Sequence, residues 1–203
     1  MKVAGSSPVL PTIARNWISF TKEDPVSFFI LIFEYTESNR NVKEGNIMKM
    51  KGVIHTFLGE LILTEEDGYI TAVDFGGMEK AEEEKSGVCT PLMLEAEKQL
   101  QEFYEGKRDQ FTLPLHPEGT AFQKRVWEAL LTIPKGETRS YQEIAKLCGN
   151  EKASRAVGMA NNRNPIPIFI PCHRVIGKNG ALVGYGGGLP IKEALLRLEG
   201  SIL

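Results

Sequence analysis

The chain has 203 residues, 42% of them hydrophobic and 25% charged, which is enough for a sizeable core in one domain or two small ones. This composition excludes a disordered or fibrous protein. The longest apolar run near the N-terminus, Phe28 to Phe33, is far shorter than the roughly 20 residues that a membrane span needs, so we expect a soluble protein without a membrane partner.

Charge is distributed unevenly along the chain. The formal net charge is −2, but eight Lys or Arg residues stand against three acidic residues between Pro134 and Lys178. A basic segment on an acidic chain favours a local anionic partner, with a solvated face as the alternative interpretation. The three cysteines, Cys89, Cys148 and Cys172, form no C-x-x-C pair, which predicts neither a disulfide framework nor a cysteine-rich zinc site and fits a reducing cytoplasm.

The first convincing strand patterns begin after an N-terminal tail. Prolines interrupt residues 1–47, so we expect a poorly structured tail that is not necessarily native, with the folded protein beginning at Met48 or Met50. Residues 53–63 and 69–75 are rich in β-branched and aromatic residues, and between them Asp67-Gly68 is a strong hairpin signal. This pattern predicts a small sheet.

A helix is predicted after the sheet. Thr90 followed by Pro91 is typical of an N-cap and a first helical position, and Gly106 marks the end of the helix. The residues expected on its buried face are Leu92, Ala96, Leu100 and Phe103. A short strand is then predicted over residues 111–115.

Two capping boxes predict the next two helices. Thr120 and Gln123 open one helix, and Ser140 and Glu143 open a shorter one that ends at Gly149. The side chains expected to point inward are Phe122, Val126, Leu130 and Ile133 on the first helix and Ile144, Ala145 and Leu147 on the second. A further helix over residues 152–161 is basic and rich in small residues, which indicates either a DNA-binding helix-turn-helix or an ordinary helical hairpin.

Cys172 and His173 are the strongest candidates for chemistry. Residues 164–171 are interrupted by prolines and cannot form a helix, so we expect an extended apolar segment that leads to Cys172. A thiol attacks as the thiolate, and a neighbouring imidazole that takes its proton supplies the thiolate near neutral pH. A buried structural cysteine is the alternative interpretation. Residues 189–199 close the chain as a helix, with Gly200 at its C-terminal cap.

With these elements in order, the chain resembles the O6-alkylguanine-DNA alkyltransferases, also called methylated-DNA–protein-cysteine methyltransferases. The similarity covers about residues 50–203 and is most specific between residues 140 and 199. It rests on Ser140-Tyr141-Gln142, Arg155-Ala156-Val157-Gly158, Asn164-Pro165, Ile170-Pro171-Cys172-His173-Arg174-Val175-Ile176, Gly184-Tyr185, Gly187-Gly188-Leu189, Lys192-Glu193 and Glu199-Gly200.

The resemblance implies a role for each residue around the thiol. Cys172 would accept the alkyl group, His173 would take the thiol proton through a bound water, and Glu199 would orient and charge the imidazole. Adjacent residues on an extended chain point apart, so a water bridge between Cys172 and His173 is easier than direct contact. A carboxylate behind a histidine is a general orienting device, although a glutamate on a terminal helix is ordinarily a solvated charge.

The resemblance also implies how the protein meets its partner, alkylated double-stranded DNA. The O6 atom of a stacked guanine is out of reach of a buried thiol, so the nucleotide would be flipped out of the duplex. Tyr141 would press on the phosphate 3′ to the target nucleotide, and Arg155 would fill the gap that the base leaves. The second helix of the motif would lie in the minor groove, where small residues permit close approach. These residues are Ala153, Ser154, Ala156 and Gly158.

The pocket for the flipped guanine is implied in the same way. Asn164 would brace the hinge between the recognition helix and the active-site strand, with an ordinary Asn-Pro turn as the alternative. Tyr185 and the backbone around Val175 and Gly186 would line the pocket. Some relatives have serine at the position of Gly186, so only the backbone N–H would donate to O6 in this chain.

Neither a metal nor a cofactor is expected. Some relatives bind a structural zinc through N-terminal cysteines and histidines, but Cys89, His55 and His116 show no ligand spacing. A non-enzymatic branch of the family replaces the acceptor cysteine by tryptophan, and Cys172 argues against that branch.

We therefore predict a two-domain α/β protein. Residues 48–113 would form a small ribonuclease H-like sheet-and-helix domain, and residues 114–203 a winged-helix-like domain that carries the helix-turn-helix and the thiol. The predicted activity is irreversible, single-turnover transfer of a methyl or alkyl group from O6-methylguanine, and from O4-methylthymine, to Cys172 by a cytoplasmic monomer. Two rivals stay open: a binding-only module that senses damaged DNA or regulates transcription, and a cysteine hydrolase.

Overall fold

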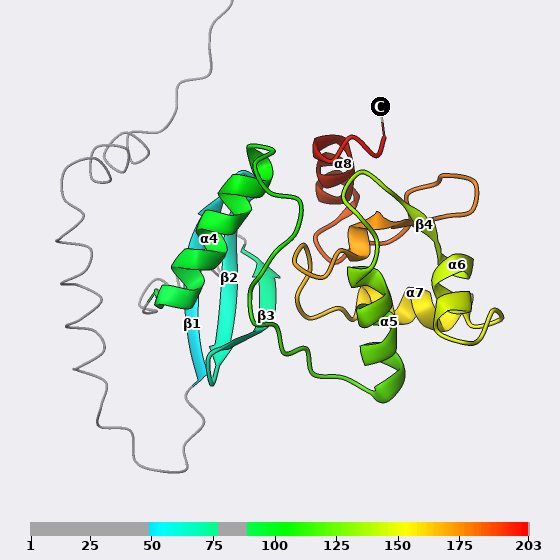
Figure 1. The fold of residues 1–203 in the computed structure, drawn as a ribbon, viewed down its shortest axis with the longest axis horizontal. Helices are drawn as coiled ribbons and strands as arrows, with labels where there is room; N and C mark the ends of the chain where they lie inside the picture. Colours follow the sequence, from blue (N-terminus) through cyan, green and yellow to red (C-terminus); the bar gives the residue numbers. More distant parts are fainter. Residues whose placement is uncertain (1–48, 77–88, 203) are drawn as a thin grey trace, which may run out of the picture. The chain divides into compact units, whose positions relative to one another are not determined.

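A small antiparallel sheet with one helix precedes a helical region in the described part of the chain (Figure 1). The structure is a computed structural model that describes residues 49–76 and 89–202, so the predicted tail 1–47 lies outside the described residues. The two-domain α/β prediction is confirmed. No helix in these two ranges is long and apolar enough to cross a membrane.

The sheet contains β1 (Lys49–Thr56), β2 (Gly59–Glu66) and β3 (Tyr69–Phe75) in the order β1-β2-β3. The predicted hairpin between β2 and β3 is confirmed, because Glu66 pairs with Tyr69 across the two-residue turn. Asp67 and Gly68 have φ angles of 49° and 79°, the left-handed conformations that this tight hairpin turn requires at both positions.

The interpretation of residues 53–63 as one strand is wrong, because the chain reverses in the middle of this segment. Thr56 pairs with Gly59, and Phe57 and Leu58 form the turn between β1 and β2. The Thr56 hydroxyl donates to the Gly59 carbonyl over 2.8 Å and accepts from the Leu58 N–H over 3.1 Å. This side chain closes a turn whose own residues are apolar and carry no turn signal.

Helix α4 (Pro91–Tyr104) follows the sheet and begins as predicted, since the Thr90 side chain accepts a hydrogen bond from the Met93 N–H. Gly106, with a φ of 71°, follows its C-terminal cap. The buried residues of α4 are Met93, Ala96, Gln99, Leu100 and Phe103, and Leu92 is only partly buried.

The predicted strand over residues 111–115 is also wrong. This segment forms one isolated bridge, in which the Ile70 N–H donates to the Pro114 carbonyl and the His116 N–H donates to the Ile70 carbonyl, both over 2.9 Å. Pro114 has no N–H, which interrupts any longer ladder. The segment therefore covers the edge of β3 without extending the sheet.

Both predicted capping boxes are present. Thr120 and Gln123 open α5 (Ala121–Leu131), and Ser140 and Glu143 open α6 (Tyr141–Leu147). Leu147 is 63% exposed, so its predicted inward direction is wrong; Cys148, one residue later, packs against the core instead.

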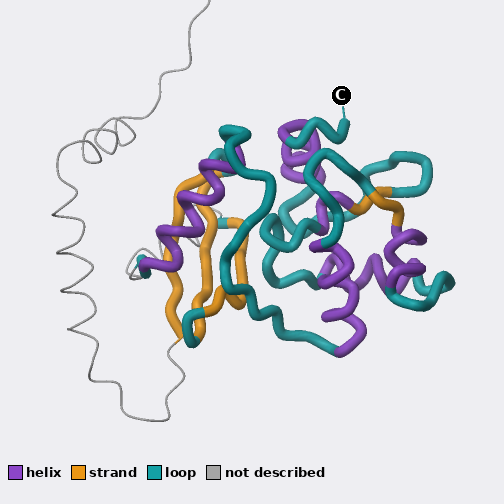
Figure 2. The backbone as a smooth tube through the Cα atoms, viewed as in Figure 1, coloured by secondary structure: helices purple, strands orange, loops and turns teal. Residues whose placement is uncertain are grey.

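The remaining elements complete the helical region. Helix α7 (Ser154–Asn162) packs on α6 as the second helix of the predicted helix-turn-helix. The last helix is α8 (Leu189–Leu198). The two-residue strands β4 (Arg139–Ser140) and β5 (Val175–Ile176) pair in parallel. The chain between α7 and α8 is mostly loop (Figure 2), and it contacts the sheet where the Val73 N–H donates to the Pro165 carbonyl over 2.8 Å.

Candidate active site

The segment that leads to Cys172 is a buried, irregular loop. It is not helical, as predicted, but the expected extended run is wrong, because Ile168 has a φ of 75° and the Ile170 N–H donates to the Ile166 carbonyl. Asn164 fixes this bend with both ends of its amide. Its Nδ2 donates to the Ile170 carbonyl over 2.8 Å, and its Oδ1 accepts from the Ile166 N–H over 3.1 Å.

Cys172 and His173 lie in one short 3₁₀ turn, η1 (Cys172–Arg174), which leads directly into β5. The expectation that they follow each other on an extended chain is therefore wrong. Pro171, with φ −80° and ψ 61°, bends the backbone, and the Arg174 N–H donates to the Pro171 carbonyl over 3.1 Å. Successive side chains on such a turn are about 120° apart, so Cys172 and His173 do not point in opposite directions.

The Cys172 side chain is buried, at 6% exposure, among groups that act on its charge. Burial raises the pKa of the Cys172 thiol to about 11, while a hydrogen bond from Asn164 and the positive charge of Lys192 act in the opposite direction. The group is therefore a neutral thiol at pH 7. A base has to remove its proton before it can act as a nucleophile.

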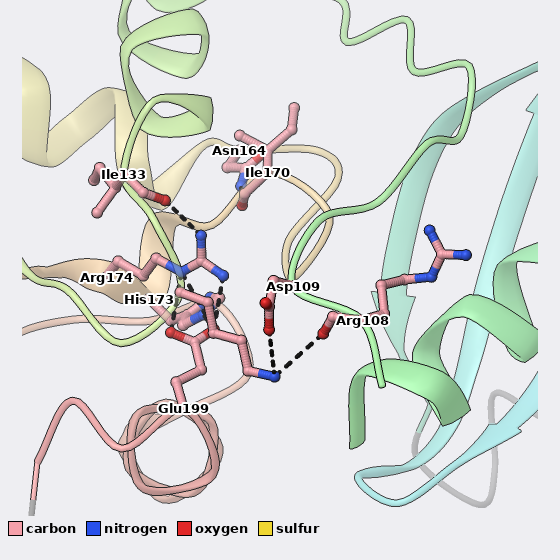
Figure 3. Close-up of polar contacts among 9 residues, drawn as sticks. Arg108, Asp109, Ile133, Asn164, Ile170, His173, Arg174 and Glu199 are labelled. Atoms are coloured by element: carbon pink, nitrogen blue, oxygen red, sulfur yellow. Dashed lines mark hydrogen bonds and ion pairs between the residues drawn. The ribbon is translucent and has the colours of Figure 1, made fainter. Parts of the chain in front are cut away.

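Behind the thiol, His173, Glu199 and Arg174 form a buried, hydrogen-bonded chain (Figure 3). His173 Nε2 lies 2.8 Å from Glu199 Oε1. The Arg174 guanidinium donates through Nε and Nη2 to the same carboxylate at 2.9–3.2 Å, and through Nη1 to the Ile133 carbonyl at 2.6 Å. His173 and Arg174 thus both bind the carboxylate of Glu199, which is fully shielded from solvent.

The charges within this chain fix the tautomer of His173. Burial raises the pKa of Glu199, but the hydrogen bonds and charges of His173 and Arg174 outweigh it and hold the pKa below its usual value. Burial lowers the pKa of His173, against the opposing effect of Glu199, so the imidazole is neutral at pH 7. A neutral imidazole beside a carboxylate carries its proton on Nε2, which leaves Nδ1 as an acceptor. Nδ1 is buried and has no hydrogen-bond partner among the described residues.

Lys192 lies on the inward face of α8 and is fully buried. Its Nζ donates to the Val175 carbonyl over 2.7 Å and to the Val183 carbonyl over 2.9 Å. Burial lowers the pKa of Lys192 to about 8, and the charge of Cys172 acts to raise it. The ammonium group therefore holds β5 and the loop after it, and it contributes positive charge near the thiol.

Tyr185 closes the site from the loop before α8. Its hydroxyl is buried without a hydrogen-bond partner in the described ranges, and burial raises its pKa well above the usual value. Its ring lies edge-on to His173, with centroids 6.5 Å apart, and to Phe75 of β3, with centroids 5.8 Å apart. Gly186 is exposed, and a Cβ there would meet nothing within 4 Å, so a serine would fit at this position.

Helices α6 and α7 present the other predicted residues. Arg155 is exposed on α7, whereas Gly158 faces Tyr141, since a Cβ at Gly158 would lie 3.7 Å from the Tyr141 ring. The Tyr141 hydroxyl donates to the Val183 carbonyl over 3.1 Å, and burial followed by the charge of Cys172 raises its pKa. Tyr141 therefore adjoins the thiol site. Ala153 and Ser154 are half-buried at the start of α7, and no described contact connects them or Arg155 to Cys172.

Sequence reasoning assigned no role to Arg174 or Lys192. A signal for Lys192 is present on α8, where Lys192, Leu195, Leu196 and Glu199 recur at helical spacing and form one buried stripe. Two ionisable residues on an apolar stripe indicate a buried polar site. Arg174 carries no comparable signal, because its partners Ile133 and Glu199 are distant in the sequence.

Within residues 49–76 and 89–202, no group of three or more His, Cys, Asp or Glu side chains is arranged to hold a metal ion. The side chains that the structure brings together at the site are a buried thiol, a neutral imidazole, a carboxylate and two cationic groups.

Comparison with known proteins identifies the family. Residues 49–117 match the ribonuclease-like domain and residues 121–201 the DNA-binding domain of 6-O-methylguanine DNA methyltransferase. A methylated-DNA–protein-cysteine methyltransferase of Methanosarcina acetivorans is 53% identical over 146 residues, which is 71% of this chain and 94% of that protein. The constitutive enzyme of Bacillus subtilis is 50% identical over 150 residues, covering 71% and 91% of the two chains.

Solved structures lead to the same family. The crystal structure of the Mycobacterium tuberculosis O6-methylguanine methyltransferase superimposes with a TM-score of 0.67 at 43% identity, covering 76% of this chain and 94% of that one. The same organism's protein in complex with DNA superimposes with a TM-score of 0.64 at 43% identity, covering 73% and 91%. This chain belongs to the O6-alkylguanine-DNA alkyltransferase family, the methylated-DNA–protein-cysteine methyltransferases.

Proposed function

We propose that this protein repairs DNA by transferring the methyl or alkyl group of O6-methylguanine to the sulfur of Cys172, once per molecule. The observation that carries the proposal is that buried Cys172 shares one 3₁₀ turn with His173, which is bonded to Glu199, and that Tyr141 of the helix-turn-helix adjoins this site. The relatives described above are named methylated-DNA–protein-cysteine methyltransferases, and this name supports the same reaction here.

The first step is removal of the thiol proton. His173 Nδ1 is the buried acceptor left free by the bond between Nε2 and Glu199, and it lies in the same turn as Cys172. One water molecule between Sγ and Nδ1 would pass the proton to the imidazole. Glu199, held ionised by Arg174, stabilises the imidazolium that forms, and Lys192 stabilises the thiolate.

In the second step, the thiolate attacks the methyl carbon. The S–C bond forms as the bond between the methyl carbon and O6 breaks, and guanine leaves with a proton returned to it. The product is S-methylcysteine, a thioether without a hydrolysable bond, so the acceptor is not regenerated. The protein is therefore a stoichiometric reagent as well as an enzyme.

DNA would dock on α6 and α7. Cys172 is buried at the end of an irregular loop, so a stacked base has to be flipped out of the duplex to reach it. Arg155 would fill the gap in the stack, and Ala153, Ser154 and Gly158 would let α7 approach the minor groove. Tyr141 would give up its hydrogen bond to the Val183 carbonyl and press on the phosphate 3′ to the target.

The flipped base would enter a pocket lined by Tyr185, Val175 and Gly186, beneath the bend that Asn164 holds. The buried Tyr185 hydroxyl is available for a polar edge of the base. We extend the proposal to O4-methylthymine, because its methyl group, like that of O6-methylguanine, is carried by an exocyclic oxygen next to a ring nitrogen. We also propose that the protein acts as a cytoplasmic monomer and that its two domains span residues 48–113 and 114–203.

Mass spectrometry after mixing the protein with duplex DNA that contains O6-methylguanine tests the proposal. We expect one methyl group per protein, located on the peptide that contains Cys172, and none on a Cys172→Ala variant that still binds the duplex. Binding without any methyl transfer by the wild type would favour the binding-only module. Release of more than one equivalent of product per protein would favour a cysteine hydrolase.

A further inference from the structure

Lys135 joins the loop between α5 and β4 to the sheet domain through three contacts. Its Nζ lies 3.2 Å from Asp109 Oδ1, donates to the Arg108 carbonyl over 3.2 Å, and lies 4.6 Å from the centre of the Phe103 ring. Phe103 is a buried residue of α4, and the Lys135 side chain is only 15% exposed. The combination of a carbonyl, a carboxylate and an aromatic face fixes the ammonium group more firmly than an exposed ion pair would.

The loop that carries Lys135 also touches the acceptor site. The Ile133 carbonyl accepts from Arg174 Nη1 over 2.6 Å. Gly136, with a φ of 84°, approaches so closely that a Cβ there would lie 3.3 Å from the backbone oxygen of Glu199. Between residues 133 and 136 the loop thus binds the Arg174 guanidinium and passes close to the backbone of Glu199.

Arg174 transmits the position of this loop to the histidine. The guanidinium is buried, and its Nη1 uses the Ile133 carbonyl while Nε and Nη2 hold Glu199. If the Ile133 carbonyl moves, a buried donor is left unsatisfied, so the guanidinium has to rotate to recover a partner. That rotation displaces Glu199, which is bonded to His173 over 2.8 Å.

We propose that Lys135 is a positioning residue for alkyl transfer. By anchoring residues 133–136 to Asp109, Arg108 and Phe103, it sets the place of the Ile133 carbonyl and hence the geometry of Arg174, Glu199 and His173. The sheet domain thereby contributes to the reaction without touching the substrate. The inference rests on the proposed function.

Single-turnover kinetics with Lys135→Met test this role, because methionine keeps the packing on Phe103 and removes the charge. At saturating O6-methylguanine duplex, we expect the maximal rate of methyl transfer to fall about tenfold, since a small misplacement of a catalytic group has an effect of at least this size. The dissociation constant for the duplex should change less than about twofold. Lys135→Arg should recover most of the rate, because a guanidinium can also pair with a carboxylate, donate to a carbonyl and lie over an aromatic ring.

Two further variants separate positioning from general structure. Lys98→Met removes an exposed lysine of α4 that pairs with Glu95, and it should leave the rate unchanged. Asp109→Asn removes the ion pair at a carboxylate that is 77% exposed, so the fold is retained, and the rate should fall about twofold to threefold. If Lys135→Met does not fold, the rate of Asp109→Asn tests the positioning role of Lys135 instead.

The sharpest test combines Lys135→Met with Glu199→Gln. If Lys135 acts through Glu199, its replacement should cause no further loss of rate in the Glu199→Gln background. An equal loss in both backgrounds, or a Lys135→Met rate within twofold of the wild type, would overturn the inference. Failure of the wild type to accept a methyl group would instead overturn the proposed function, so the two failures are distinguishable.

Discussion

Helices α7 and α8 are of similar length, nine and ten residues, yet they use their charged residues in opposite ways. Helix α8 turns Lys192 into the core and has Glu199 as its C-terminal cap, and both side chains have direct protein partners. Helix α7 buries Val157 and Ala160 but leaves Arg155 exposed, with no hydrogen bond or ion pair to any described residue.

The cost of burying charge explains this difference. A buried charge is tolerated only where partners compensate for its lost hydration, so the groups on α8 are held in one geometry, which suits proton transfer. An exposed, unpaired arginine stays hydrated and can exchange water for the phosphates or bases of DNA. In the proposed function, α8 therefore contributes to a rigid site for chemistry, and α7 provides an adaptable surface for DNA.

The largest effect on the rate of methyl transfer is expected at His173, which we propose as the general base. His173→Ala should lower the rate of methyl transfer at pH 7 by about 10²–10⁴-fold, the usual contribution of a general base. Without the imidazole, the thiol has to ionise alone, so the rate of the variant should rise with pH toward the Cys172 pKa of about 11. In the wild type, the rate should fall only as the pH drops through the His173 pKa, which burial holds below its usual value.

The control is His55→Ala, which removes an exposed histidine on β1 and should leave the pH–rate profile unchanged. Rates are measured by rapid quench with labelled duplex from about pH 5 to about pH 10, a range that extends to both sides of the ordinary histidine pKa of about 6.5. Superimposable profiles for His173→Ala and the wild type would contradict the assignment of His173 as the base.

The next largest effect concerns stability. Glu199→Gln removes the charge that Arg174 and His173 share, and leaves a buried guanidinium without its counterion, so we expect the free energy of unfolding to fall by about 3–5 kcal/mol. Because the folded pKa of Glu199 is lowered, its stabilisation is present above the ordinary glutamate value of 4.5 and is lost as the pH falls. The free energy of unfolding of Glu199→Gln should therefore lack the part of the acid dependence that Glu199 contributes.

Glu193→Gln on the exposed side of α8 is the matched control. Glu193 pairs with Arg197 at a site where both side chains are about half exposed, and its replacement should change stability by less than about 0.5 kcal/mol. Urea unfolding at several pH values gives both numbers. Equal losses of unfolding free energy in Glu199→Gln and Glu193→Gln would contradict the distinction between inward and outward charges on α8.

Local signals made much of the fold predictable. The capping boxes at Thr120 and Ser140, and the Asp67-Gly68 hairpin, are encoded by residues within four positions of one another, and all three are present. The turn at Phe57-Leu58 was not predicted, because neither residue is typical of a turn. The hydrogen bonds that close it come from Thr56, and threonine is equally common in strands.

The site was less predictable, because its contacts join distant parts of the chain. Arg174 reaches the Ile133 carbonyl, 41 residues earlier, and Glu199, 25 residues later, and no short pattern encodes either contact. The choice of Cys172 followed from its neighbour His173, whereas Glu199 required the family resemblance. The bend at Pro171 replaced an expected extended strand by a 3₁₀ turn, and it depends on a backbone ψ that proline does not fix.

A smaller effect, confined to DNA, is expected on α7. Arg155→Ala should leave the free energy of unfolding within about 0.5 kcal/mol of the wild type, because the side chain is exposed and makes no hydrogen bond or ion pair with a described residue. Methyl transfer from duplex DNA should fall about tenfold, whereas transfer from a free alkylated guanine base should be unchanged, because a free base needs no flipping. Lys107→Ala, which removes an exposed lysine beyond α4, controls for the loss of one positive charge. Equal losses on duplex and free base would place Arg155 in the chemical step, and α7 would then resemble α8 in function as well as in length.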